Sequence, residues 1–176
     1  MADNVLYKII VGVIILMILA LTIVPVIMKR IHNRKLVEER VNINNTFVKW
    51  LNESIDILTR LDRWYDSVVT MPENEFGNID VPGDTLYPIL EHIDNLIEKL
   101  KDERLRYLRS TDQFKANANI MYENVINYLQ FIRLSTLNLK TNEYIMRSKE
   151  SLNGMKQQIT STIVNLRKLS IVKVVQ

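Results

Sequence analysis

The sequence predicts an all-α protein with one N-terminal transmembrane helix followed by a three- or four-helix bundle whose helices pack in a coiled-coil-like way. Three observations predict this fold class. Residues 9–28 form one uninterrupted apolar run, apolar residues recur at heptad spacing through most of the remaining chain, and the 176 residues include only four Gly and four Pro. Glycine and proline punctuate turns and loops, so their scarcity favours long helices.

The apolar run Ile9–Met28 contains no charged residue. At about 1.5 Å per residue, a helix of this length spans about 30 Å, the thickness of the hydrocarbon layer. A cleaved signal peptide has an apolar core of only about 7–15 residues and small residues at its cleavage site, whereas this run ends in Met28-Lys29-Arg30. A soluble protein of this size rarely encloses a helix that is apolar on every side. We therefore expect an uncleaved signal-anchor and a single-pass protein.

The charges beside the run predict its orientation. Only Asp3 and Lys8 precede it, whereas four basic residues follow closely: Lys29, Arg30, Arg34 and Lys35. Because basic residues are retained on the cytoplasmic side, we expect the N-terminus outside and the bulk of the chain in the cytoplasm. The four cations are also suited to anionic lipid headgroups, although their role in stopping translocation is a sufficient explanation.

The sequence divides into five predicted segments. They are an external N-terminus (1–8), the transmembrane helix (9–28), a basic juxtamembrane segment (29–35), the bundle (36–169, with an acidic loop at 71–85) and an apolar C-terminal tail (170–176).

The first bundle helix is predicted from Asn33 to about Met71. It carries one apolar seam of two alternating heptad positions: Phe47, Leu61 and Val68, with Leu51, Leu58 and Tyr65. No helix breaker separates Met28 from Leu36, so this helix can run on from the membrane segment. Trp50 and Trp64 share one of its faces and are interpreted as core or helix-interface residues.

Residues 71–85 (MPENEFGNIDVPGDT) are predicted to form a loop, because two Pro and two Gly stop any helix there. The stretch from Trp64 to Glu98 contains eight acidic residues and no Lys or Arg. One interpretation is a solvated acidic surface; the other is an acidic patch that docks a basic partner. Loops of this length are usually functional or flexible, so this loop is the best candidate for a specific contact. We propose that five of its residues contact a partner: Glu73, Glu75, Phe76, Asp80 and Asp84.

The second bundle helix is predicted to begin at a Thr85 cap and carries Leu86, Ile93, Leu100 and Tyr107 at intervals of seven. Residues 110–113 (Ser-Thr-Asp-Gln) form a capping-box pattern, which predicts a short turn before a third helix. Three of that helix's apolar residues, Ala118, Val125 and Ile132, also repeat every seven.

Thr141 is a possible cap for a fourth segment, in which Ile145, Leu152, Ile159 and Leu166 follow at intervals of seven. The third and fourth segments could equally be one helix. The C-terminal tail contains β-branched residues that either fold back on the bundle or enter a partner: Ile171, Val172, Val174 and Val175.

The sequence shows no catalytic or cofactor motif. There is no Cys, no Gly-rich phosphate loop, and neither His32 nor His92 has the Glu three residues before it that a bundle metal site uses. The Asp102-Glu103 pair is expected on a solvent face. We therefore expect no enzyme activity, no metal and no cofactor.

Nucleic acid is not an expected partner either. The basic run 99–109 is interleaved with Leu100, Leu105 and Leu108, which we interpret as core positions, so its cations form an ordinary solvated face. A formal charge of +3 is too small to indicate a nucleic-acid partner by itself.

Two functions are compatible with this pattern. The first is a non-enzymatic, membrane-anchored subunit or adaptor that assembles with other proteins or with itself at the bilayer. The alternative is a signalling or regulatory sensor that binds a small ligand in a pocket lined by Trp50, Trp64 or Tyr65. No motif assigns the chain to a known family.

Overall fold

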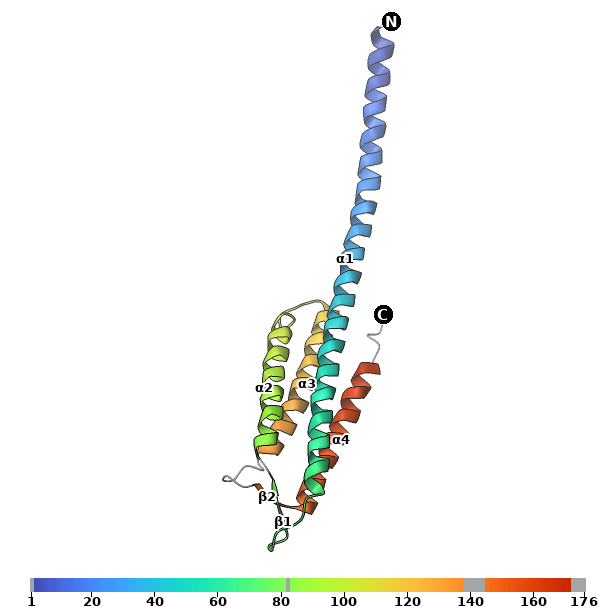
Figure 1. Ribbon diagram of the computed structural model, residues 1–176. Helices are drawn as coiled ribbons and strands as arrows, with labels where there is room; N and C mark the ends of the chain where they lie inside the picture. Colours follow the sequence, from blue (N-terminus) through green and yellow to red (C-terminus); the bar gives the residue numbers. More distant parts are fainter. Residues whose placement is uncertain (1, 82, 138–144, 172–176) are drawn as a thin grey trace. The chain divides into compact units, whose positions relative to one another are not determined.

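The computed structural model describes residues 2–81, 83–137 and 145–171, which form four helices and one two-stranded sheet (Figure 1). In chain order the elements are α1 (Ala2–Val69), β1 (Asn78–Val81), α2 (Gly83–Leu105), α3 (Gln113–Leu137), β2 (Ile145–Ser148) and α4 (Lys149–Ile171). The chain divides into two compact units, Met1–Asn42 and Ile43–Gln176.

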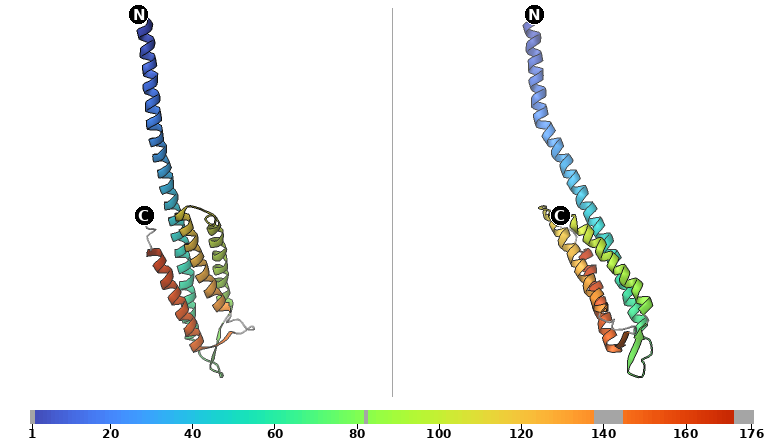
Figure 2. Two further views of the ribbon diagram at one scale, coloured as in Figure 1. Left: turned by 180° about the vertical axis from the view of Figure 1, so that it is seen from behind. Right: turned by 90° about the vertical axis from the view of Figure 1, so that its left-hand side faces the viewer.

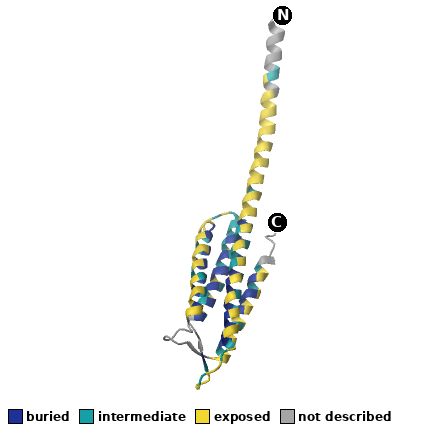
Figure 3. Cartoon of the chain, viewed as in Figure 1, coloured by how far each residue is buried: buried dark blue, intermediate teal, exposed yellow. Residues whose placement is uncertain are grey.

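The first unit is the N-terminal part of α1. Every side chain from Leu16 to Met28 is exposed (Figure 3). Among the described residues, one helix is long and apolar enough to cross a membrane by length and composition, and its best 18-residue window has a mean hydropathy of 3.0 with no buried residue. The helix continues through Pro25, and the Thr22 hydroxyl donates to the Ile18 carbonyl at 3.0 Å.

The second unit is a four-helix bundle made by the C-terminal part of α1 together with α2, α3 and α4. The views agree that the four helices lie side by side and alternate in direction (Figures 1 and 2). Residues 70–81 and strand β2 lie at one end of the bundle, and the turn 106–112 lies at the other (Figure 1). The predicted all-helical bundle is thus confirmed, with a small sheet added at one end.

The core of the bundle confirms the predicted heptad seams. The six seam residues of α1 are buried: Phe47, Leu51, Leu58, Leu61, Tyr65 and Val68. Leu152, Ile159 and Leu166 of α4 and Ala118, Val125 and Ile132 of α3 are also buried. Because these residues repeat every seven positions, each helix turns one apolar stripe toward the other three.

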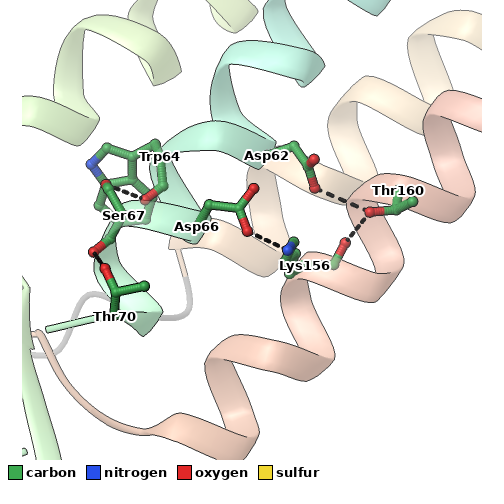
Figure 4. A network of polar contacts seen from close by, with 7 residues as sticks. All are labelled: Asp62, Trp64, Asp66, Ser67, Thr70, Lys156 and Thr160. Atoms are coloured by element: carbon green, nitrogen blue, oxygen red, sulfur yellow. Dashed lines mark hydrogen bonds and ion pairs between the residues drawn. The ribbon is translucent and has the colours of Figure 1, made fainter.

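Polar contacts join α1 to α2 and α4 near the end of the bundle where β1 and β2 lie. The Trp64 indole donates to the Thr85 hydroxyl of α2 at 2.9 Å. Toward α4, Lys156 pairs with Asp66, and the Thr160 hydroxyl donates to Asp62 at 3.0 Å (Figure 4). These contacts fix the register of α1 against α2 and α4.

Helices α2 and α3 are joined by two ion pairs. Arg104 of α2 approaches Glu123 at 3.1 Å and donates to the Asn119 side chain at 2.9 Å. Arg133 of α3 donates to Asp94 at 2.8 Å, and this hydrogen bond raises the pKa of the guanidinium.

The structure separates the third and fourth helices, a question that the sequence left open. Helix α3 ends at Leu137 and α4 begins at Lys149, with β2 immediately before it. Ile145 therefore lies in a strand and does not begin the α4 heptad series. The proposed cap Thr141 lies outside the described residues.

The beginnings of the other helices refine the predictions. Asp112 caps α3, because its carboxylate accepts from the Phe114 and Lys115 amides at 2.8 and 3.1 Å. The predicted turn before the third helix is confirmed, but the capping box is not: α3 begins at Gln113, and the Ser110 hydroxyl accepts from the Asp112 amide at 3.2 Å. The predicted Thr85 cap is wrong: α2 already begins at Gly83, and Thr85 uses its hydroxyl to receive the Trp64 indole.

Two expectations for the α2–α3 connection are also wrong. Leu105 and Leu108 are 64% and 47% exposed, because they lie off the heptad series, whose last member, Tyr107, is buried. Glu103 is buried instead of lying on a solvent face: its carboxylate accepts from the Tyr107 hydroxyl at 3.0 Å and pairs with Arg106 at 3.1 Å. Both partners compensate the burial of the carboxylate.

Candidate interaction surface

The predicted loop contains an ordered turn at residues 74–78, at the end of the bundle where β1 and β2 lie. The Asn74 amide donates to the Asn78 carbonyl at 2.7 Å, and the Gly77 amide donates to the Asn74 carbonyl at 2.9 Å. Gly77 has a φ of 72°, a backbone conformation that glycine adopts without steric cost. These bonds close a tight turn in which the backbone reverses its direction.

The Asn74 side chain holds the inside of the turn. Its carboxamide oxygen accepts from the Phe76 amide at 3.0 Å and from the Asn78 amide at 3.1 Å. Asparagine commonly stabilises turns through such side-chain-to-backbone bonds. Two backbone donors that would otherwise face solvent are therefore satisfied locally.

Both sides of the turn are attached to the bundle. On one side, the Met71 amide donates to the Val68 carbonyl at 3.0 Å and the Met71 side chain packs against the core. On the other side, the Ile79 side chain is fully buried and β1 pairs antiparallel with β2, from Asn78↔Ser148 to Val81↔Ile145. The chain between these two attachments is short and internally bonded.

The turn presents one aromatic ring between acidic groups. Phe76 is 79% exposed, the highest value among the exposed large apolar residues of the described chain. Glu73 and Glu75 beside it are exposed, as is Asp84 at the beginning of α2. The turn therefore presents one exposed apolar ring with acidic side chains beside it.

The structure thus brings together part of the predicted contact set. Glu73, Glu75 and Phe76 lie on the same connection, and Asp84 lies just beyond the strand that ends it. Of Asp80 the structure describes the backbone, in β1, where Asp80 pairs with Met146. Asn74 and Gly77, which shape the turn, were missed; the Asn-x-x-Gly spacing inside the loop was the available signal.

The remaining predicted site residues lie elsewhere. Lys29, Arg30, Arg34 and Lys35 are exposed residues of the first unit. Ile171 is the last residue of α4. The other three tail residues, Val172, Val174 and Val175, lie outside the described residues.

The residues proposed to line a sensor pocket are packed in the bundle. Trp64 and Tyr65 are buried and meet edge to face with ring centroids 4.9 Å apart. Trp50 packs against the core, with the Lys49 ammonium 5.0 Å from its ring centroid. An open groove of about 690 Å³ lies between α3 and α4, but its lining includes Tyr128 and Phe131 and none of these three residues.

Within the described part of the chain, no three His, Asp or Glu side chains form a metal-binding cluster. Comparison of the chain with profiles of known protein families, with curated proteins and with solved structures finds no match.

Proposed function

We propose that this protein is a non-enzymatic, single-pass membrane subunit whose cytoplasmic helical bundle assembles with other proteins at the bilayer. The observation that carries the proposal is the exposure of the apolar stretch in α1. Eleven large apolar side chains between Val13 and Met28 are 46–75% exposed. In water, leaving so many of them uncovered costs on the order of 1 kcal/mol or more for each side chain.

A bilayer is the environment that best suits this stretch. Its side chains are apolar on every side of the helix, whereas a helix that packs on one protein partner needs a single apolar stripe. The backbone of the stretch is helical throughout, so its polar groups are satisfied within the segment, as a membrane span requires. The four basic residues that follow support retention of the bundle in the cytoplasm.

The second unit supports the assembly part of the proposal. It has its own continuous core, drawn from all four helices and from Ile79 of β1. Among the described residues, that core begins at Ile43. An anchor joined to an independent bundle raises the local concentration of the bundle's binding surface at the membrane.

The experiment that tests this function is extraction of the full-length protein from its native membrane in mild detergent, followed by measurement of the particle mass and identification of the co-eluting chains. The proposal predicts a particle well above the mass of one 20.7 kDa chain plus its detergent, with other subunits in fixed stoichiometry. A monomer without companions would contradict it.

A further inference from the structure

We infer that the turn 73–78 is the docking element of this assembly, and that it inserts the Phe76 ring into an apolar pocket bordered by Lys or Arg on a partner protein. This inference rests on the proposed function, because it names the surface and the partner chemistry through which the bundle would assemble. Three properties of the turn support it: the ordered backbone, the attachment to the core and the acidic side chains.

The backbone that carries Phe76 is held in one conformation. Two backbone hydrogen bonds and the Asn74 carboxamide define the turn, while Met71 and the buried Ile79 attach it to the core. A residue that is ordered before binding loses less conformational freedom when it binds. The turn is therefore pre-organised to present a single large side chain.

No described part of the fold packs against the ring. Phe76 does not belong to the core or to the side chains packed against it, and its exposed fraction is 79%. The turn itself requires only the backbone amide of Phe76, which any residue other than proline would supply. Aromatic residues placed in a partner's pocket are frequent energetic centres of protein interfaces.

The charged side chains nearest to Phe76 in the chain are acidic. Glu73 and Glu75 flank the ring on its own connection and Asp84 is exposed just beyond β1, while residues 64–98 contain no Lys or Arg. The paired strand β2 places Arg147 opposite Ile79, and the exposed Lys149 follows it. The acidic residues nevertheless lie nearest to Phe76 in the chain. A complementary partner carries cations around its pocket, which steers association and excludes acidic surfaces. The same carboxylates oppose contact with an anionic lipid surface, so a protein partner is favoured over the membrane.

The test is photo-cross-linking of the full-length chain in its native membrane, with benzoylphenylalanine in place of Phe76. We expect one discrete adduct with a different protein, and we expect the cross-linked peptide to be apolar with Lys or Arg beside it. An adduct with lipid, with a second copy of this chain or with an acidic peptide would overturn the inference, as would the absence of a discrete adduct. Benzoylphenylalanine at Phe131, which is 52% exposed on α3, is the matched control and should not give the same adduct.

Affinity measurements with the cross-linked partner then test the role of each group. Phe76→Ala should weaken binding by at least about 30-fold, as expected of an interface hot spot, while Phe76→Leu should retain more of the affinity. Glu73→Gln together with Glu75→Gln should slow association and reduce its dependence on salt. Unchanged binding in Phe76→Ala would overturn the inference. The melting temperature should stay constant in these variants, because the replaced side chains are exposed.

The inference and the proposed function fail in different ways. If the wild-type particle contains no other subunit, the proposed function fails, and the docking element with it. If the wild-type particle contains other subunits and the Phe76→Ala particle contains them at the same stoichiometry and affinity, only the docking element is wrong.

Discussion

Replacing Tyr122 with phenylalanine tests how the centre of the bundle is built. The Tyr122 ring is fully buried, meets Phe47 edge to face at 5.2 Å and stacks on Tyr107 at 5.9 Å between ring centroids. Its hydroxyl has no hydrogen-bond partner among the described residues. Burial, followed by the neighbouring Tyr107 and Glu103, raises the pKa of Tyr122 well above its usual range.

The lack of a partner for the hydroxyl and the raised pKa set the expected change in the free energy of unfolding. At neutral pH, a buried hydroxyl without a partner costs about 1–3 kcal/mol, so Tyr122→Phe should leave the free energy of unfolding unchanged or raise it by up to that amount. Above pH 10, the unfolded tyrosine loses its proton while the folded one keeps it. Because the folded pKa is the higher one, wild-type stability falls as the pH rises past the unfolded value. By pH 11 the loss attributable to Tyr122 should be about 1 kcal/mol.

The assay is urea unfolding of the full-length protein in detergent at pH 7, 9 and 11, with circular dichroism used to monitor the loss of helix. Between pH 9 and 11 the wild type should lose about 1 kcal/mol more than Tyr122→Phe. Tyr87→Phe is the matched control for the loss of a hydroxyl, since Tyr87 is 46% exposed and its replacement should leave the free energy of unfolding at pH 7 nearly unchanged. Equal slopes in the wild type and Tyr122→Phe would refute the reasoning.

Three further predictions concern the core, the surface and the anchor. Leu58→Ala should destabilise the bundle by about 2–5 kcal/mol in urea unfolding, because Leu58 is fully buried; Leu105→Ala, at an exposed position, is the control, and equal effects would contradict the assigned core. The Asp66–Lys156 pair should show little coupling in a double-mutant cycle, because its side chains are 54% and 35% exposed; a coupling as large as the effect of Leu58→Ala would show that the pair is shielded from water. Leu19→Arg should weaken membrane insertion by about 3 kcal/mol, measured as the fraction that remains with the membrane after an alkaline wash, and an unchanged fraction would argue against a span centred there.

The helical core was predictable because its signal is local and repetitive. Leu51, Leu58 and Tyr65 recur every seven residues, and all three are buried. Such spacing can be satisfied in one way only, by turning that stripe toward other helices. The prediction therefore did not depend on knowing which helix packs beside which.

The errors occurred where long-range contacts decide the structure. The pairing of Asn78 with Ser148 joins residues far apart in the chain, and short strands of four residues carry almost no periodic signal. Glu103 is buried where its hydrogen-bond partner Tyr107 stacks on Tyr122 of α3, a contact between helices that the spacing of charges could not reveal. The loop was predictable from its Pro and Gly content, whereas the exposure of Phe76 depends on which of the neighbouring apolar residues enters the core, and that residue is Ile79.

The most direct test of a membrane-anchored bundle is the accessibility of single cysteines, which is clean because the sequence contains none. Asn4→Cys and Glu75→Cys variants of the full-length chain would be treated in intact cells with a maleimide that cannot cross the membrane. The account predicts that Asn4→Cys is labelled from outside and that Glu75→Cys is labelled only after the membrane is permeabilised. Labelling of Glu75→Cys in intact cells, or recovery of the protein in the soluble fraction, would contradict it.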